Sequence, residues 1–440
     1  MLKIDSRKVV SGDTFLALRG VNTDGHNYIL DAIKNGATRV IVEEGLYDVE
    51  TIIVDDTKKY LEEYLYNNYY DKISKLKLIG ITGTNGKTTT SFLIYQSLNK
   101  NGIKCAYIGT IGFYTDKRID TSNTTPNLYE LYNMLINCVD LGYDYVVMEV
   151  SSQGLAMGRV NTLKFDYVIF TNLTMDHLDY HVTMENYMKE KLKLFSMTRD
   201  GIAIINNDDI YSKNFLLDNN KNITYGKSGD YVISDIDMDV NGTKFKLNNK
   251  DYCTKLIGEY NVYNISIVII LLDILGISKD VIGSLEPPVG RMEIVKYNEN
   301  LIIIDFAHTP DALDKILDTV SNIKHNKIIT VIGCGGNRDK VKRHLIGSIA
   351  TSKSDYAIFT SDNPRNEDPM EILDDITSKL DTKNFEIIVN REESINKSIQ
   401  MLSKNDILLL LGKGHENYQI IGNKKIPFND KETVFKIIGR

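Results

Sequence analysis

No segment of this sequence is apolar for long enough to cross a membrane as a helix. The longest apolar run, residues 265–277, is interrupted by Ser266 and Asp273, so we interpret it as a helix of the protein core. The first residues, Met1-Leu2-Lys3-Ile4-Asp5, hold no apolar stretch of the kind that secretory signals carry. We therefore expect no membrane partner.

Cysteine is scarce, and no two cysteines stand close together in the sequence. The four are Cys105, Cys138, Cys253 and Cys334. This spacing excludes a zinc cluster built on paired cysteines and gives no sign of a disulfide framework. Buried free thiols are typical of reducing compartments, so we expect a cytoplasmic protein.

An excess of basic residues is also missing. The formal net charge is −7, and no basic tract interleaved with aromatic residues occurs, so we expect no nucleic-acid partner. Internal repeats and low-complexity linkers are absent as well. What remains is the composition of an ordinary globular protein, with 42% hydrophobic and 25% charged residues. A chain of 440 residues is long enough for about three domains.

Short apolar segments alternate with helical patterns along the chain, which predicts an α/β fold of three domains. Residues 1–75 are predicted to form a small N-terminal α/β domain, with strands at 39–42 and 51–54. Residues 76–287 are predicted to form a central P-loop ATPase-like domain with a mostly parallel sheet. Its strands include 145–148, 167–170 and 202–205.

A proline pair, Pro287-Pro288, marks the second predicted boundary. Residues 288–440 are predicted to form a C-terminal Rossmann-like α/β domain. Its expected strands are 301–304, 327–332, 356–360, 386–389 and 407–411. In open α/β sheets ligands bind outside the carboxyl ends of the strands, so polar residues that follow these strands are candidate site residues.

The most informative stretch is residues 80–90, Gly-Ile-Thr-Gly-Thr-Asn-Gly-Lys-Thr-Thr-Thr. It lies between an apolar strand and a helical pattern, an arrangement that binds phosphate through backbone N–H groups and the helix dipole. Lys87 would reach the β- and γ-phosphates, and the Thr88 hydroxyl would bind Mg²⁺. The general P-loop pattern has a glycine where this chain has Ile81, and a bare Gly-Lys-Thr could be an ordinary strand–helix turn.

Three polar segments of the central domain also lie next to predicted strands or helices. Glu149 directly follows the strand at 145–148 and is a candidate Mg²⁺ ligand, although a lone glutamate there is more often solvated. Residues 171–181 contain two histidines and two aspartates, whose spacing is not that of a zinc cluster and better fits a second Mg²⁺ or a phosphate contact. Residues 123–126 could bind a ligand or simply cap a helix.

Four polar segments follow strands of the C-terminal domain: 305–310, 333–339, 362–365 and 412–416. Each alone could be a turn, but together they suggest one binding face. Arg338 and Arg365 could hold a carboxylate there, because guanidinium groups pair with carboxylates through two parallel hydrogen bonds.

These motifs, in this order, resemble those of the Mur ligases, the ATP-dependent amino-acid-adding enzymes of peptidoglycan synthesis. The segment 82–89 matches the P-loop variant of that family, which accounts for Ile81. The segment 172–181 and the motifs at 5–7, 24–26, 258–264, 290–293, 305–313 and 412–416 match the branch that adds the third peptide residue. Asp362-Asn363-Pro364-Arg365 resembles the signature of enzymes that add meso-diaminopimelate.

The resemblance implies a role for each matching residue. The ATP-binding residues would be Gly83, Thr84, Asn85, Gly86, Lys87, Thr88, Thr89, Asn264, Arg291 and Asp305. The catalytic residues would be Lys87, Glu149, Lys191 and His177. The metal ligands would be Thr88, Glu149, His177 and Lys191, the last as a carbamate. The residues that hold the UDP-N-acetylmuramoyl-dipeptide would be Ser6, Asn123, Thr124, Thr125, Ser151 and Arg159. The amino-acid-binding residues would be Arg338, Asp362, Asn363, Arg365, Gly412 and Glu416.

The implied activity is the ATP-dependent addition of meso-diaminopimelate to UDP-N-acetylmuramoyl-L-alanyl-D-glutamate through an acyl phosphate, with Mg²⁺ and a carbamylated Lys191. The implied enzyme is a monomer with small-molecule substrates. A paralogue that adds lysine, lanthionine or another amine is the nearest alternative. A folate-type glutamate ligase and a nucleotide-binding regulator without activity are further alternatives. The Asp-Asn-Pro-Arg signature argues against the lysine and folate readings, and the retained metal ligands argue against the regulator.

The chain departs from the family pattern at several positions. Gln153 stands where the family often has His, Met157 replaces a polar substrate contact, Phe306 replaces Tyr, and residues 341–344 differ from Gly-Lys-Arg-Pro. The family usually extends further before Asp5. We therefore expect the nucleotide sugar to be held differently here.

Overall fold

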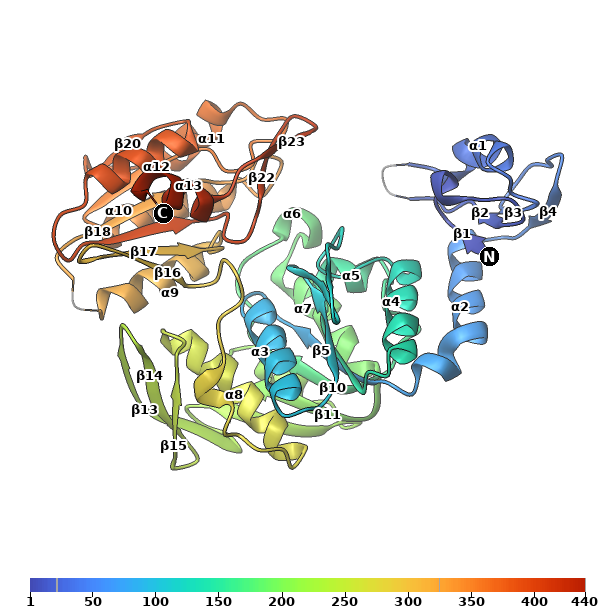
Figure 1. The fold of residues 1–440 in the computed structure, drawn as a ribbon, viewed down its shortest axis with the longest axis horizontal. Helices are drawn as coiled ribbons and strands as arrows, with labels where there is room; N and C mark the ends of the chain where they lie inside the picture. The colour runs from blue at the N-terminus through green and yellow to red at the C-terminus, as the bar shows by residue number, and fades with distance from the viewer. Residues whose placement is uncertain (21–22, 324, 440) are drawn as a thin grey trace.

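The computed structural model describes residues 1–20, 23–323 and 325–439. Figure 1 shows three α/β units in chain order, each built on its own sheet. The first sheet is parallel throughout and runs in the order β1 (Leu2–Lys3), β2 (Thr14–Leu16), β3 (Arg39–Val42) and β4 (Glu50–Ile53). Helix α1 (Ile29–Lys34) covers a small core of its own.

A helix of 17 residues, α2 (Thr57–Ile73), leads from the first unit to the second. Asp56 caps its N-terminus by accepting hydrogen bonds from the backbone N–H groups of Lys58 and Lys59. Figure 1 shows the first unit at one end of this helix and the central sheet at the other. Leu61 and Leu65 of α2 join the same hydrophobic core as the central sheet, which fixes the helix on it.

The central sheet has 11 strands in the order β15-β14-β13-β12-β11-β10-β5-β9-β6-β7-β8. The run from β13 to β6 is parallel, and antiparallel hairpins extend it at both edges. The strands are β5 (Lys77–Thr82), β6 (Cys105–Gly109), β7 (Gly112–Tyr114), β8 (Arg118–Ile119), β9 (Tyr145–Glu149), β10 (Phe165–Phe170), β11 (Thr198–Asn206), β12 (Lys221–Gly226), β13 (Tyr231–Asp239), β14 (Gly242–Leu247) and β15 (Lys250–Thr254).

Helices cover both faces of this sheet, because its interior strands are apolar on both sides. On one face α3 (Lys87–Lys100) and α8 (Glu259–Ile274) pack over residues such as Ile79, Ile81 and Val147. On the other face lie α4 (Leu128–Asp140), α5 (Ser152–Ala156) and α7 (Met184–Leu192), preceded by the short α6 (Leu178–His181). The apolar run at 265–277 is therefore largely a core helix, as predicted.

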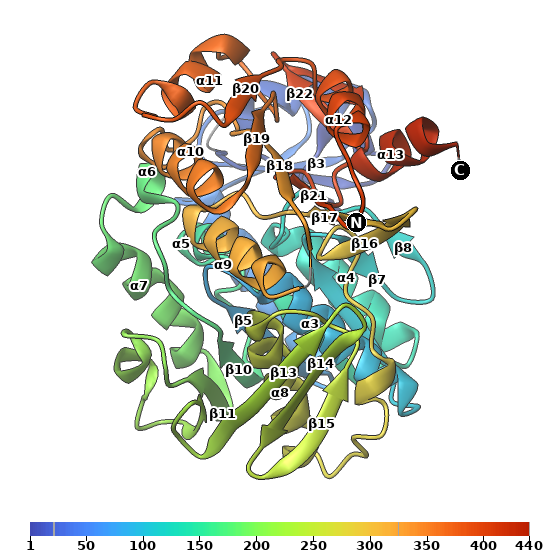
Figure 2. The same ribbon diagram turned by 90° about the vertical axis from the view of Figure 1, so that its left-hand side faces the viewer.

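The third sheet has the order β16-β17-β21-β18-β19-β20 and is parallel except for β16. Its strands are β16 (Glu293–Tyr297), β17 (Asn300–Asp305), β18 (Ile328–Ile332), β19 (Tyr356–Phe359), β20 (Phe385–Ile387) and β21 (Ile407–Leu411). A separate two-stranded sheet follows, the hairpin of β22 (Tyr418–Ile421) and β23 (Lys424–Pro427). The helices of this unit are α9 (Pro310–Ser321), α10 (Val341–Lys353), α11 (Pro369–Thr377), α12 (Arg391–Gln400) and α13 (Asp430–Ile438). Figure 2, turned by 90°, shows this unit stacked above the central sheet.

The predicted fold class is confirmed, and every predicted strand overlaps an observed one. The strands predicted at 39–42 and 407–411 have those bounds in the structure. The antiparallel hairpins β7–β8, β13–β15 and β22–β23 were not predicted. The sequence suggested that Glu149 directly follows a strand, but in the structure it is the last residue of β9. No helix within the described ranges is long and apolar enough to cross a membrane.

Candidate active site

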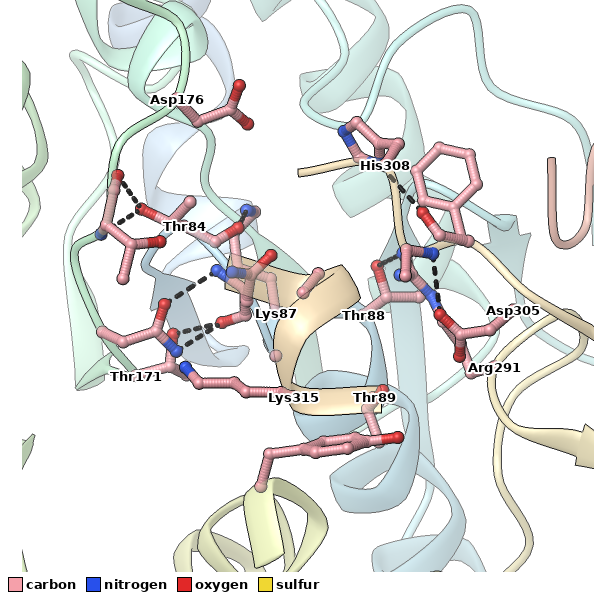
Figure 3. Close-up of a pocket in the computed structure, with 18 of the residues that line it drawn as sticks. Thr84, Lys87, Thr88, Thr89, Thr171, Asp176, Arg291, Asp305, His308 and Lys315 are labelled. Carbon is pink, nitrogen blue, oxygen red and sulfur yellow. Dashed lines mark hydrogen bonds between the residues drawn. The ribbon is translucent and has the colours of Figure 1, made fainter. Parts of the chain in front are cut away.

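The loop between β5 and α3 has the geometry of a phosphate-binding loop (Figure 3). Gly86 adopts a φ of 85° and precedes the first residue of α3 without offering a side-chain cap, so the first N–H groups of the helix remain available to an anion. Gly83 has no room for a side chain, since a Cβ there would lie 1.9 Å from Oγ1 of Thr171. The two glycines are therefore required by the shape of the loop.

The segment that follows β10 lies along this loop and holds it. The backbone N–H of Thr84 donates to the carbonyl oxygen of Asn172 at 2.8 Å, and the N–H of Asn85 donates to Asn172 Oδ1 at 2.9 Å. Thr84 Oγ1 accepts a hydrogen bond from the N–H of Thr174 at 3.0 Å. Two segments that are separated in the sequence thus form one rigid unit, which sequence reasoning had treated as two motifs.

Two lysine side chains converge on one carbonyl oxygen of the loop. Nζ of Lys87 and Nζ of Lys191 donate to the carbonyl oxygen of Gly83 at 2.9 and 2.7 Å. Lys191 lies on α7, is only 1% exposed and sits 4.5 Å from the ring centroid of Tyr187. Burial, followed by the charge of Lys87, holds the pKa of Lys191 well below its usual value. An uncharged Lys191 amine is the form that can react with carbon dioxide, so its surroundings fit a carbamate.

Glu149 is fully buried at the end of β9, and both of its oxygens are engaged. Oε2 accepts from Oγ1 of Thr88 at 2.9 Å and from Oγ1 of Thr110 at 3.1 Å. Oε1 accepts from the N–H of Thr110 at 2.9 Å and from the hydroxyl of Tyr107 at 2.5 Å. A carboxylate and a threonine hydroxyl side by side are hard oxygen ligands, the type that Mg²⁺ prefers, so this pair fits the metal predicted there.

His177 belongs to the segment that follows β10, and its environment differs from that of Glu149. It has a φ of 54°, and its Nε2 lies 3.5 Å from Oδ2 of Asp176. Burial lowers the pKa of His177, which favours the neutral imidazole. In the described part of the chain, no group of three or more His, Cys, Asp or Glu side chains could hold a metal ion. A metal here would need ligands of other kinds, such as a threonine hydroxyl, a lysine carbamate and phosphate oxygens.

At the strand ends of the C-terminal unit, Lys413, Glu416 and Asn363 form a closed hydrogen-bonded set. Nζ of Lys413, whose side chain is fully buried, donates to Oε2 of Glu416 at 2.7 Å and to Oδ1 of Asn363 at 3.3 Å. Nδ2 of Asn363 donates to the same glutamate oxygen at 2.9 Å. Oε1 of Glu416 takes part in none of these bonds, so it can accept a hydrogen bond from an ammonium group.

The two predicted arginines, Arg338 and Arg365, both lie next to Gly335. Nη1 of Arg365 donates to the carbonyl oxygen of Gly336 at 2.8 Å, and Arg365 adopts a φ of 51°. Burial, followed by the charge of Arg338, lowers the pKa of Arg365. Two neighbouring positive charges suit an anion better than an isolated arginine does.

Contacts join the C-terminal unit to the phosphate-binding loop, to the first turn of α3 and to the segment that follows β10. Nδ2 of Asn85 donates to Oδ2 of Asp311 on α9 at 2.8 Å, and Nη2 of Arg291 donates to Oγ1 of Thr88 at 3.3 Å. Nζ of Lys342 on α10 lies 3.8 Å from Oδ1 of Asp176. Figure 3 shows Asp176 and His308 above Lys87 and Thr88, and Arg291 and Asp305 to the right of Thr88.

One cavity of about 790 Å³ lies between the two units. From the central unit it is lined by Thr84, Asn85, Gly86, Lys87, Thr88, Thr89, Asn123, Thr124, Glu149, Ser151, Arg159, His177 and Asn264. From the C-terminal unit it is lined by Arg291, Asp305, Arg338, Asp362, Asn363, Arg365, Gly412 and Glu416. Tertiary structure therefore gathers nearly all of the predicted site residues around one space.

Four predicted site residues do not line this cavity: Ser6, Gly83, Thr125 and Lys191. Ser6 belongs to the N-terminal unit. Thr125 is fully buried, and its hydroxyl donates to the carbonyl oxygen of Glu149 at 3.0 Å. Thr125 also accepts from the N–H of Ser151 at 2.9 Å. In this structure Thr125 therefore orders the loop after β9.

The predicted nucleoside contacts have partners within the protein. Oδ1 of Asn264 accepts from Oγ1 of Thr90 at 3.1 Å. The two oxygens of Asp305 accept from the N–H groups of Met292 and Ala307, each at 2.7 Å. Burial raises the pKa of Asp305. These bonds fix both side chains at the edge of the cavity.

Three family models match the chain. The model described as the Mur ligase middle domain matches residues 81–272, the one described as Mur ligase, glutamate ligase domain, matches 290–414, and the one described as Mur ligase family, catalytic domain, matches 1–72. This chain belongs to the Mur ligase family. The family expected from the sequence motifs is confirmed.

Mur ligases of several bacteria resemble it over nearly their whole length. Two relatives are named UDP-N-acetylmuramoyl-L-alanyl-D-glutamate--2,6-diaminopimelate ligase. The one from Clostridium perfringens is 44% identical to this chain, and the alignment covers 99% of this chain and 94% of the relative. The one from Aquifex aeolicus is 41% identical, and the alignment covers 100% of this chain and 93% of the relative. A solved structure of a ligase with the same name has a TM-score of 0.68 at 32% identity, covering 100% of this chain and 94% of that one. The MurF ligase of Thermotoga maritima, solved with ADP, has a TM-score of 0.73 at 19% identity and covers 99% and 96% of the two chains. It shares the fold.

Sequence reasoning missed several residues that shape the site. Tyr107 and Thr110 lie in no motif that the sequence analysis singled out, and no role was assigned to Lys342 or Lys413, although Lys413 lies within the motif at 412–416. Residues 341–344 were noted only as a departure from the family pattern, and no role was predicted for Lys342. Only the contacts between distant strands and domains identify these residues.

Proposed function

We propose that this Mur ligase joins an amine of meso-diaminopimelate to the D-glutamate carboxylate of UDP-N-acetylmuramoyl-L-alanyl-D-glutamate, with ATP as the energy source. The observation that carries the proposal is the cavity shared by the phosphate-binding loop and by Arg365, Asn363 and Glu416. The names of the relatives at 40–44% identity support the same acceptor and amine. The reaction belongs to cytoplasmic peptidoglycan precursor synthesis.

The reaction has two steps. The γ-phosphoryl group of ATP passes to an oxygen of the glutamate side-chain carboxylate, which leaves ADP and an acyl phosphate. The neutral amine then attacks the acyl carbon, its nitrogen loses a proton, and the tetrahedral intermediate expels inorganic phosphate to leave the amide. Lys87 and the N–H groups at the start of α3 stabilise the negative charge of the phosphates during the first step.

Thr88, Glu149, His177 and a carbamate on Lys191 would hold Mg²⁺. The ion, when bound, neutralises charge on the phosphate oxygens. Carbamylation suits Lys191 because burial and the neighbouring Lys87 ammonium, which shares the Gly83 carbonyl, disfavour a second positive charge there. The carbamate forms when the uncharged amine adds to carbon dioxide and loses a proton, which places a negative charge beside Lys87.

The C-terminal unit supplies specificity. Arg365, with Arg338 nearby, would pair with the distal carboxylate that diaminopimelate has and lysine lacks, while Glu416 and Asp362 would hold its ammonium groups. Asn123, Thr124, Ser151 and Arg159 line the same cavity from the central unit and would hold the muramoyl-dipeptide. Ser6 would contact the uridine diphosphate from the N-terminal unit.

The test is ATP-dependent phosphate release with the UDP-linked dipeptide and a panel of amines: meso-diaminopimelate, L-lysine and lanthionine. Turnover that is highest with meso-diaminopimelate supports the proposal. Preference for lysine or lanthionine would instead identify a paralogue with another third residue. The absence of turnover with every amine, in a preparation that binds ATP, would favour a nucleotide-binding regulator.

A further inference from the structure

The hydroxyl of Tyr107 donates a hydrogen bond of 2.5 Å to Oε1 of Glu149. Tyr107 lies on β6, next to β9 in the central sheet, and is paired in register with Val147. Glu149 stands two residues beyond Val147, so its side chain points to the same face of the sheet as Tyr107. Both side chains are fully buried.

The space for this hydrogen bond is provided by a glycine. A Cβ on Gly109 would lie 2.3 Å from Oε1 of Glu149 and 2.3 Å from the hydroxyl oxygen of Tyr107. Any other residue at this position would separate the two groups. The local sequence therefore accommodates the contact between Tyr107 and Glu149.

Four donors bind the carboxylate of Glu149, two to each oxygen. Oε1 faces the β6 side, where it accepts from Tyr107 and from the N–H of Thr110. Oε2 faces the phosphate-binding loop, where it accepts from the hydroxyls of Thr88 and Thr110. Because Tyr107 holds Oε1, the other oxygen remains on the side of Thr88.

The ring of Tyr107 is itself fixed by aromatic neighbours. Phe92 lies 5.8 Å away between ring centroids, Tyr95 lies 6.4 Å away and Tyr114 lies 5.6 Å away, all in edge-on arrangements. A side chain that is already immobilised loses little entropy when its hydroxyl binds the carboxylate. Tyr107 is therefore a rigid support for Glu149.

We propose that Tyr107 is a positioning residue that keeps Glu149 in the orientation in which Oε2, beside the Thr88 hydroxyl, receives the divalent cation. The inference rests on the proposed function only in taking Glu149 and Thr88 as ligands of that cation. The competing explanation is that Tyr107 merely fills the core between α3 and the sheet. The two explanations differ in whether the hydroxyl matters for metal binding.

The experiment compares Tyr107→Phe with Tyr114→Phe. The first change removes only the hydroxyl on Glu149. The second removes a hydroxyl from the same aromatic cluster, and among the described residues Tyr114 has no hydrogen bond to Glu149. Binding of Mn²⁺ in the presence of ADP is followed by electron paramagnetic resonance, and thermal unfolding is recorded for each protein. This measurement needs no acceptor substrate, so it is independent of which amine the enzyme uses.

Loss of a hydrogen bond to a buried charge should weaken Mn²⁺ binding by on the order of tenfold in Tyr107→Phe. The Mg²⁺ concentration for half-maximal turnover should rise by a similar factor, while Tyr114→Phe behaves as wild type. Equal Mn²⁺ affinity in Tyr107→Phe and wild type would overturn the proposal. If Tyr107→Phe also melts earlier, Mn²⁺ affinity measured well below the melting temperature decides the question in the same way.

Discussion

Nζ of Lys191 donates a hydrogen bond of 2.7 Å to the carbonyl oxygen of Gly83, although 108 residues separate them. Nζ of Lys87 donates to the same oxygen at 2.9 Å. The buried lysine of α7 is therefore in direct contact with the backbone of the phosphate-binding loop. The shared acceptor also brings two groups that are ordinarily cationic together.

Replacement of Lys191 by alanine should reduce turnover by about a hundredfold or more, because the metal would lose its carbamate ligand. Acetate added to the medium should restore part of the activity, since a small carboxylate can enter the vacated space. Carbon-13 NMR after incubation with labelled bicarbonate should show a carbamate signal in the wild type and none in Lys191→Ala.

The matched control is Lys189→Ala, on the same helix. Lys189 is exposed and pairs with Glu185 at 2.6 Å, so its loss should leave both turnover and the carbamate signal unchanged. A wild-type protein without the signal that is nevertheless fully active would contradict the carbamate.

Replacement of Arg365 by alanine should raise KM for meso-diaminopimelate far more than KM for ATP. Losing one partner of a buried charge pair costs roughly 2–5 kcal/mol, which corresponds to about 30-fold to more than 1,000-fold in affinity. Steady-state kinetics with each substrate varied in turn measures the two constants. Equal increases in both would argue against a role for Arg365 in amino-acid recognition.

Replacement of Asp430 by asparagine should destabilise the C-terminal unit by about 3–5 kcal/mol. Asp430 and Arg391 are both fully buried and are joined by hydrogen bonds of 2.8 and 2.7 Å, and Arg391 also donates to the carbonyl oxygen of Leu411. The change leaves the arginine charge buried without its counter-ion. Urea unfolding followed by circular dichroism measures the loss.

A second ion pair between the same two helices serves as the control. Lys436 and Glu392 are 2.7 Å apart on the surface, with side chains 74% and 49% exposed. Glu392→Gln should therefore change stability by less than about 1 kcal/mol. A similar decrease in the free energy of unfolding for Asp430→Asn and Glu392→Gln would show that burial of the first pair adds nothing to stability.

The ion pair between Glu367 and Arg343 should make stability depend on pH in the acid range. Hydrogen bonds from Arg343 at 2.9 and 3.0 Å lower the pKa of Glu367 from 4.5 to about 2. Because the folded pKa lies below the unfolded one, this contribution is complete above pH 4.5 and is lost as the pH falls toward 2.

The melting temperatures of wild type and Glu367→Gln should differ most above pH 5 and converge as the pH falls from 4.5 toward 2. Differential scanning calorimetry at a series of pH values measures the difference. Glu371→Gln, an exposed position on the following helix α11, should follow the wild-type curve throughout. A constant difference between wild type and Glu367→Gln across this range would contradict the assignment.

The order of apolar strands and helical segments was sufficient to predict the α/β class and most parallel strands. Buried parallel strands are apolar on both faces, so they stand out as short continuous runs, as at 145–148 and 407–411. The hairpin from β13 to β15 was missed, because the prediction relied on continuous apolar runs, whereas these edge strands alternate polar and apolar residues.

The sequence alone also determined which chemistry the chain can perform, since Lys87, Thr88 and the strand-end motifs are local patterns whose residue types are dictated by phosphate and carboxylate binding. Tertiary structure alone decided which of these residues meet. Tyr107 reaches Glu149 only because β6 lies beside β9, and Lys191 reaches Gly83 only because α7 packs beneath the loop. Such contacts depend on sheet order and helix packing, which are set by long-range burial of apolar surface and leave no local signal in the chain.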